Sequence, residues 1–219
     1  MSESRNVRIF TENDMECRSE SRAELQFWYD FASTYSYLSA MRIEELGRAA
    51  GVAIAWRPFL LGPIFQAQGW ATSPFNLYPA KGRYMSRDMQ RIAAARGLAF
   101  GLPTPFPQHS VLAARVALIG CEEGFIAAFT KATYLAEFAK GEDISHTEVL
   151  AGILDSIGVD SARILAETQL PKIKNWLKAQ TDAAQTLGIF GAPAFYTSDG
   201  ELFWGDDRLD AAMAWAARL

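Results

Sequence analysis

Two hydroxyl side chains stand where a predicted strand ends and a predicted helix begins. Ser33 and Ser36 follow the apolar stretch 25–31 and lie three residues apart. The first turn of a helix presents unpaired N–H groups and the positive end of the helix dipole, which together stabilise an anion. The alternative is that Ser33, or Thr34 beside it, simply caps the helix, and from this segment alone the cap is the favoured interpretation.

Two later segments also contain residues suited to binding. Pro193 stands in residues 190–195 (FGAPAF), directly before an apolar run. An X–Pro bond can be cis, although trans is commoner, and the sequence does not distinguish a cis bond from an ordinary turn. Asp206 and Asp207 are adjacent at the start of the last predicted helix. They could bind a ligand ammonium group, or they could serve as a cap and a first-turn acid.

The elements around these segments are of α/β type. An aromatic-rich run at 25–31 and a β-branched run at 52–56 predict strands, and helical periodicity covers 35–50 between them. The short turns of this unit imply parallel strands with a right-handed crossover. Near the other end, an Asp-Gly turn between runs 194–197 and 201–204 predicts a hairpin.

A helical block separates these two parts. Residues 62–79 and 98–108 are rich in loop-forming residues, and the predicted helices cover 81–96, 110–138, 145–157, 161–168, 171–187 and, after the hairpin, 208–219. The order is therefore βαβ, helices, ββα. It predicts one four-stranded mixed sheet in a domain of residues 25–219, with a helical insertion at about 62–188.

Composition excludes several classes of protein. Half of the 219 residues are hydrophobic and the net charge is −4, with no basic stripe that would suit nucleic acid. No apolar run approaches the roughly 20 residues of a membrane span. Residues 1–24 are polar and predict a leader outside the folded domain, so a cytoplasmic protein is expected. Cys17 and Cys121 form no C-x-x-C pair.

Five segments together resemble the 2-hydroxychromene-2-carboxylate isomerase family, a group with the DsbA-type thioredoxin fold that is related to the kappa-class glutathione transferases. The segments are DFASTYSYL, WRPFLLG, PAKGRYMSRDMQR, GAP and FWGDDRL, at residues 30–38, 56–62, 79–91, 191–193 and 203–209. The resemblance spans residues 25–219 and implies a thioredoxin-like fold with a large helical insertion. In that fold Ser33 and Ser36 stand where other members carry the two thiols of C-x-x-C.

The resemblance implies glutathione as a cofactor. Ser33 would be the catalytic residue, lying beside the glutathione sulfur and favouring its thiolate form. The backbone of Ala192 would pair with the cysteinyl part of glutathione if the bond to Pro193 is cis. Asp206 and Asp207 would hold the γ-glutamyl end, and Asp207 is the better candidate for its ammonium group.

Further ligand contacts also follow from the resemblance. Lys81 would bind the glycyl carboxylate or a substrate carboxylate, because a positive charge suits either. Asn76 and Tyr84 would face the substrate. Arg57 could add positive charge there, or could be an internal ion-pair residue instead.

Some residues are expected to be structural. Arg91 is predicted to pair with Asp88, three residues before it on one helix. His109 and His146 are predicted at the surface or at a helix cap, since their spacing without a nearby cysteine does not suit zinc. Two departures from the family pattern, Thr34 for proline and Ala194 for threonine, leave the fold prediction intact but weaken the transfer of substrate contacts.

The predicted function is a cytoplasmic, glutathione-dependent isomerase of aromatic catabolism. It would open the ring of a small aromatic or chromene acid and change the geometry of a double bond through a transient glutathione adduct. A kappa-like transferase, whose conjugate leaves as product, is the first alternative. A non-catalytic glutathione- or peptide-binding thioredoxin module is the second. Neither a nucleic-acid partner nor a membrane is expected, and a homodimer is compatible with the resemblance.

Overall fold

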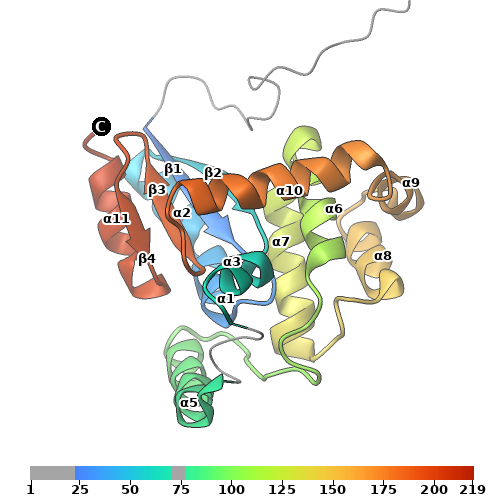
Figure 1. Ribbon diagram of the computed structural model, residues 1–219, viewed down its shortest axis with the longest axis horizontal. Coiled ribbons are helices and arrows are strands. Elements are labelled where there is room, and N and C mark those ends of the chain that lie inside the picture. Colours follow the sequence, from blue (N-terminus) through green and yellow to red (C-terminus); the bar gives the residue numbers. More distant parts are fainter. Residues whose placement is uncertain (1–22, 71–76) are drawn as a thin grey trace, which may run out of the picture.

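The computed structural model of the chain describes residues 23–70 and 77–219 (Figure 1). Its centre is a mixed sheet with the strand order β2-β1-β3-β4. β1 (Glu24–Tyr29) and β2 (Ala53–Pro58) run parallel, while β3 (Ala194–Thr197) is antiparallel to β1 and β4 (Leu202–Trp204) is antiparallel to β3. The predicted four-stranded mixed sheet is confirmed.

β1 is a central strand that is buried on both faces, which explains why its sequence is apolar without alternation. On one face Phe27 stacks on Tyr29 and on Phe195 of β3, with ring centroids 4.9 and 5.6 Å apart. On the other face Trp28 packs edge-to-face on Phe59 at 6.1 Å. These aromatic contacts fix the register of β1 against its neighbours.

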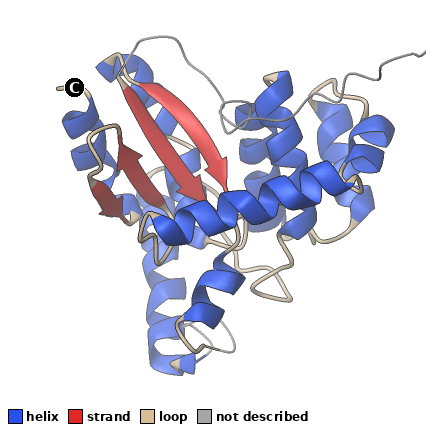
Figure 2. Cartoon of the chain, turned by 45° about the horizontal axis from the view of Figure 1, so that its top comes forward, coloured by secondary structure: helices blue, strands red, loops and turns tan. Residues whose placement is uncertain are grey.

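Helices cover both faces of this sheet (Figures 1 and 2). Within the described residues these helices are α1 (Thr34–Ala40), α2 (Ile43–Ala50), α3 (Leu61–Ala67), α5 (Pro79–Ala95), α6 (Val111–Glu123), α7 (Ile126–Tyr134), α8 (Thr147–Ser156), α9 (Ser161–Glu167), α10 (Pro171–Thr186) and α11 (Leu209–Ala216). A π-helical turn, η2 (Leu135–Ala139), extends α7, and a 3₁₀ turn, η3 (Asp206–Arg208), precedes α11. The helices from α3 to α10 lie between β2 and β3 in the chain and form the predicted insertion.

The predicted loop at 62–79 is wrong in its first part, because α3 begins at Leu61. Gly62 and Pro63 indicated a loop, but both occupy the first turn of this helix. Proline is tolerated there, since the N–H that it lacks has no partner within the helix at that position.

Two predicted long helices are each divided in the structure. The helix predicted at 35–50 breaks after α1, where Arg42 reaches across to the carboxylates of Asp206 and Asp210. The helix predicted at 110–138 ends first at Gly124, whose φ of +82° is left-handed, and restarts as α7. Tertiary contacts and a glycine cap thus override the local periodicity.

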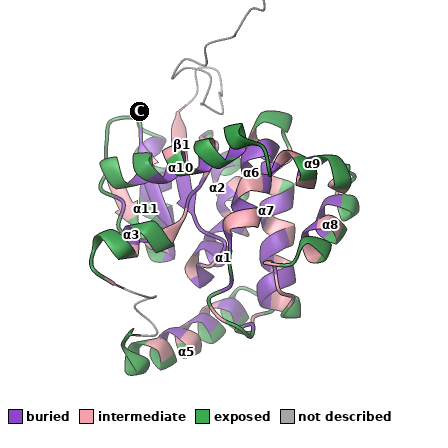
Figure 3. Cartoon of the chain, turned by 45° about the vertical axis from the view of Figure 1, so that its right-hand side comes forward, coloured by how far each residue is buried: buried purple, intermediate pink, exposed green. Residues whose placement is uncertain are grey.

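α5 lies apart from the sheet and shows an exposed outer face (Figure 3). Its inner face buries Met85, Met89 and Ala93. Among the residues that the structure describes, no helix is long and apolar enough to cross a membrane.

The sheet topology brings the three chemically interesting segments to one edge. Trp28 near the end of β1 pairs with Ala194 at the start of β3, and Ala194 pairs with Trp204 at the end of β4. The turns that follow β1 and β4 and the turn that precedes β3 therefore meet there. This edge is where the site is found.

Candidate active site

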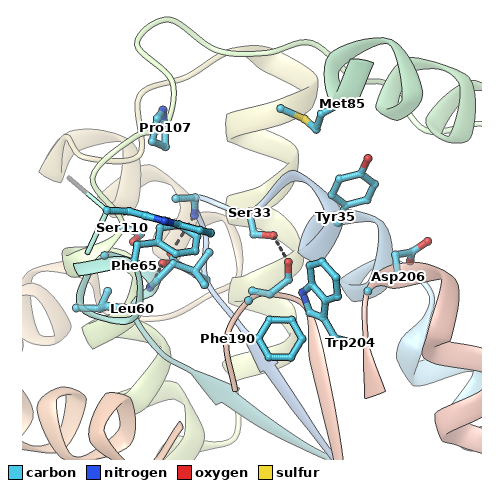
Figure 4. Close-up of a pocket in the computed structure, with 18 of the residues that line it drawn as sticks. Ser33, Tyr35, Leu60, Phe65, Met85, Pro107, Ser110, Phe190, Trp204 and Asp206 are labelled. Atoms are coloured by element: carbon cyan, nitrogen blue, oxygen red, sulfur yellow. Dashed lines mark hydrogen bonds between the residues drawn. The ribbon is translucent and has the colours of Figure 1, made fainter. Parts of the chain in front are cut away.

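Ser33 occupies the N-cap of α1, with φ −99° and ψ 113°. Its hydroxyl oxygen accepts the N–H of Ser36 at 3.2 Å and donates to the carbonyl oxygen of Ala192 at 3.1 Å (Figure 4). The side chain also lines a large cavity and is nearly buried. Ser33 is therefore both the cap and a cavity residue, so the two interpretations of the sequence do not compete.

The carboxylate of Asp30 stabilises this turn by hydrogen bonds. Its buried carboxylate accepts the N–H of Ala32 at 3.0 Å and the N–H of Leu61 at 2.7 Å, and it is bonded by the Ser110 hydroxyl. Burial raises the pKa of the Asp30 carboxyl, and these three donors act against that rise. Asp30 thus joins the turns after β1 and β2 to the start of α6. Asp30 was not among the predicted site residues, although a short acidic residue at the end of an apolar strand was a usable signal.

The cavity has a volume of about 1190 Å³. Apolar side chains make up much of its wall, among them Leu60, Phe65, Trp70, Met85, Pro107, Phe190 and Trp204 (Figure 4). Polar groups, including Lys81 and His109, interrupt this wall. Such a combination suits a mostly apolar ligand with a few charged groups.

The structure separates the two adjacent aspartates. Asp206 accepts two hydrogen bonds from the Arg96 guanidinium, at 3.1 and 2.7 Å, and one from the Ser39 hydroxyl at 2.9 Å. Its side chain is only 3% exposed, whereas the side chain of Asp207 is 74% exposed. Both residues line the cavity. The carboxylate of Asp206 is already engaged by the protein, whereas that of Asp207 is largely exposed and lies 3.5 Å from the guanidinium of Arg208.

An aromatic pair stands at the mouth of the cavity. The rings of Phe190 and Trp204 lie 5.0 Å apart, and each side chain is about half exposed. Gly191 lies directly beneath Trp204, because a Cβ atom at Gly191 would be 2.5 Å from the indole Nε1. The glycine of the Gly-Ala-Pro segment therefore makes room for the indole ring. The bond between Ala192 and Pro193 is cis.

The remaining predicted site residues divide into three groups. Lys81 and Tyr84 line the cavity from α5. Arg57 lies on β2 in register with Trp28, outside the described cavity lining, so this placement does not support its predicted substrate contact. Asn76 lies outside the described residues. The predicted pair of Arg91 and Asp88 is confirmed at 3.0 Å.

Two lining residues were not anticipated from the sequence. Tyr35 donates to Asp88 at 3.0 Å, and burial together with this bond raises the pKa of the Tyr35 hydroxyl. His109 is exposed, as expected from the sequence, but it also lines the cavity, which was not predicted. Its position after a proline-rich loop gave no periodic signal that could have placed it. Across residues 23–70 and 77–219, no group of three or more His, Cys, Asp or Glu side chains could hold a metal ion.

The chain is similar to known proteins over most of its length. The profile of the DSBA-like thioredoxin domain matches residues 24–214. The 2-hydroxychromene-2-carboxylate isomerase of Sphingobium xenophagum is 30% identical over 188 residues, which cover 85% of this chain and 94% of that protein. The protein belongs to the 2-hydroxychromene-2-carboxylate isomerase family.

Other known proteins are similar to most of the chain at lower identity. Glutathione S-transferase kappa 1 of Homo sapiens is 24% identical over 199 residues, covering 85% of this chain and 87% of that protein. A solved 2-hydroxychromene-2-carboxylate isomerase superposes with a TM-score of 0.80 at 24% identity, over 89% of this chain and 95% of the other. A cytosolic disulfide reductase of Pseudomonas aeruginosa, solved with GSH, shares the fold at a TM-score of 0.64 and 17% identity, over 89% of this chain and 96% of that one.

Proposed function

We propose that the protein is a glutathione-dependent isomerase acting on a small aromatic acid of the 2-hydroxychromene-2-carboxylate type. One observation carries the proposal. The Ser33 hydroxyl lies at the wall of a largely apolar cavity, and the family resemblance assigns its position to a cysteine of C-x-x-C. With serine at both 33 and 36, the motif has no thiol of its own. A reactive sulfur would have to come from a bound ligand.

The groups around the cavity fit glutathione in their chemistry. Glutathione carries a thiol, an ammonium group and two carboxylates. Ser33 would face the thiol, the exposed carboxylate of Asp207 would bind the ammonium group, and Lys81 would bind a carboxylate. Ala192 would contribute backbone hydrogen bonds, as an added strand does. Asp206 supports this site indirectly, by tying Arg96 and Ser39 together.

When bound, glutathione would supply a thiolate that adds reversibly to the conjugated substrate, permits rotation about the former double bond and leaves unchanged. The Ser33 hydroxyl can rotate away from the Ala192 carbonyl to donate to a sulfur anion. A hydrogen bond to the charged form lowers the pKa of a thiol. Ser33 would thus increase the thiolate fraction at neutral pH.

The aromatic side chains of the cavity wall support an aromatic substrate. Phe65, Trp70 and the pair of Phe190 and Trp204 offer flat apolar surfaces that suit an aromatic ring. Lys81 could bind the acid group of such a substrate. A kappa-like transferase remains the second candidate, because kappa-class relatives match 85% of the chain.

Calorimetry with glutathione tests the cofactor. We expect binding by the native protein and weaker binding by Asp207→Ala. Product analysis then separates the two activities, because an isomerase returns free glutathione and a transferase leaves it in a conjugate. Absence of binding at millimolar glutathione would contradict both candidate functions.

A further inference from the structure

His109 is held on the cavity wall between two anchored neighbours. The side chain of Gln108 donates to a backbone carbonyl of the 142–144 segment at 3.3 Å and accepts a backbone N–H from the same segment at 2.9 Å. Ser110 is buried, and its hydroxyl bonds the carboxylate of Asp30. Both flanking residues are therefore fixed. His109 between them is exposed and lines the cavity from a defined backbone position.

Several other titratable side chains of the cavity are occupied by contacts within the protein. The carboxylate of Asp30 accepts two backbone N–H groups. The hydroxyl of Tyr35 is committed to Asp88, and Asp206 is paired with Arg96. Each of these groups therefore already has a structural role in the site.

Two further charged residues of the cavity wall, Lys81 and Asp207, are assigned to charged groups of the ligand. In the proposed function Lys81 binds a carboxylate and Asp207 binds an ammonium group, so both would be occupied by the ligand. His109 is the histidine among the described lining residues. Histidine has an ordinary pKa of about 6.5, so it can both accept and donate a proton near neutral pH.

Asp143 lies near His109, in the segment between η2 and α8. Hydrogen bonds from Ser145 lower the pKa of the Asp143 carboxyl, and the nearby His146 and His109 lower it further. Asp143 is thus ionised at neutral pH, and a carboxylate charge lies near His109. The charged groups on the cavity wall that could also act on this imidazole are Asp30, Lys81, Asp88, Arg96, Asp206 and Asp207.

The proposed substrate class needs such a residue. A 2-hydroxychromene-2-carboxylate is a cyclic hemiketal, with a hydroxyl group and the ring oxygen on the same carbon. Ring opening breaks the bond between that carbon and the ring oxygen, and the electron pair goes to the ring oxygen. The hydroxyl loses a proton as its oxygen becomes a carbonyl, and the ring oxygen gains a proton as it becomes a phenol. One proton moves between two oxygens, with no net gain or loss.

We propose that His109 moves this proton and is the acid–base residue of the isomerisation. Its neutral imidazole accepts the hydroxyl proton, and the resulting imidazolium donates it to the ring oxygen. Ring closure uses the same two transfers in reverse. The assignment rests on the proposed function, because the hemiketal belongs to the substrate class named there.

His146→Gln is a matched control for His109→Gln. His146 also lies near Asp143, at 3.9 Å between the imidazole Nε2 and a carboxylate oxygen, but it does not line the described cavity. Both variants replace an exposed histidine by a neutral side chain. They differ in access to the cavity and share the neighbouring carboxylate.

The experiment measures kcat and KM for isomerisation of 2-hydroxychromene-2-carboxylate between pH 5 and pH 9 at saturating glutathione. We expect His109→Gln to lower kcat about 100-fold or more, the usual contribution of acid–base catalysis, and to lose a limb of the pH profile. Glutathione affinity by calorimetry should stay unchanged. Free imidazole should restore part of the activity of His109→Ala, and His146→Gln should behave as the native protein does.

Failure of the His109 assignment can be distinguished from failure of the proposed function. An unchanged pH profile in His109→Gln, with an active native enzyme, would overturn the assignment of His109 alone. An equal loss in His146→Gln would also overturn it, because the effect would then come from the charge near Asp143. A native protein that binds no glutathione or does not turn over this substrate would overturn the proposed function and the assignment together.

Discussion

The hydroxyl of Ser33 donates a hydrogen bond to the carbonyl oxygen of Ala192, which lies 159 positions later in the chain, at 3.1 Å. This bond joins the turn after β1 to the turn before β3. The helical insertion separates these turns in sequence, but the antiparallel pairing of β1 with β3 brings them together. A ligand sulfur at Ser33 would therefore compete with a carbonyl of the protein for one hydroxyl hydrogen.

We expect Ser33→Ala to raise the thiol pKa of bound glutathione and to slow isomerisation about tenfold or more. A lost hydrogen bond to a charged group is worth about 1.5 kcal/mol or more, which corresponds to that factor. The same change removes the N-cap of α1 and should cost about 1 kcal/mol of stability. The thiolate absorbance of the complex as a function of pH gives the pKa. Ser33→Thr keeps a hydroxyl and is the control; an unshifted thiol pKa in Ser33→Ala would remove Ser33 from the mechanism.

Changing Asp206 to Asn should lower stability, whereas changing Asp207 to Asn should weaken glutathione binding. Asp206→Asn leaves two guanidinium groups, of Arg42 and Arg96, without their buried carboxylate, and we expect a loss of about 3 kcal/mol in stability. Asp207→Asn should unfold as the native protein does but bind glutathione about tenfold more weakly. Thermal unfolding and calorimetry on both variants check this. Equal thermal stability of the two variants would contradict the assignment.

The sequence predicted the fold well because its signals were local and strong. The apolar run that forms β1 and the Asp-Gly turn before β4 each have one common structural outcome. The wrong helix boundaries lie where contacts with distant residues determine the backbone structure. α1 and α2 are separated at Arg42, whose partners Asp206 and Asp210 lie far away in the sequence. The helical periodicity of residues 35–50 carries no information about these distant partners.

The site was predictable in part for the same reason. Ser33 and Asp207 stand in segments with a recognisable pattern, and the structure puts both at the cavity. Nothing in two adjacent aspartates distinguishes the buried ion-pair residue Asp206 from its exposed neighbour. His109 lies in a loop without periodicity, and its position depends on bonds made by Gln108 and Ser110. Those bonds exist only once the chain has folded.

Gly191→Ala should disturb the aromatic mouth of the cavity. The added Cβ atom would lie 2.5 Å from Nε1 of Trp204, so the indole ring must move. Trp204 is half exposed and can shift at low cost, and we expect less than about 1 kcal/mol of destabilisation. KM for the aromatic substrate should rise severalfold, with a change in tryptophan fluorescence. Gly152→Ala on α8, where a Cβ atom meets nothing within 4 Å, should leave KM and the tryptophan fluorescence unchanged.

Glu137 gives the protein an unusual dependence of stability on pH. Its carboxylate is fully buried on η2, and neither oxygen has a hydrogen-bond partner. Burial raises the pKa of the Glu137 carboxyl well above its ordinary value, and the charges of Asp30 and Asp143 raise it further. The folded protein therefore holds this proton at pH values where the unfolded chain has lost it. Stability from this group is greatest at low pH and falls as the pH rises above the ordinary pKa of glutamic acid.

Glu137→Gln removes this titration without changing the size of the side chain. We expect the variant and the native protein to have similar stability near pH 4, and the variant to be more stable by about 1 kcal/mol or more at pH 8, or about 2–4 °C in Tm. Thermal unfolding of both proteins across this range gives the difference curve. Glu201→Gln, at an exposed glutamate, should give a flat difference curve. A flat curve for Glu137→Gln as well would mean that Glu137 is ionised in the folded protein, with a compensating partner.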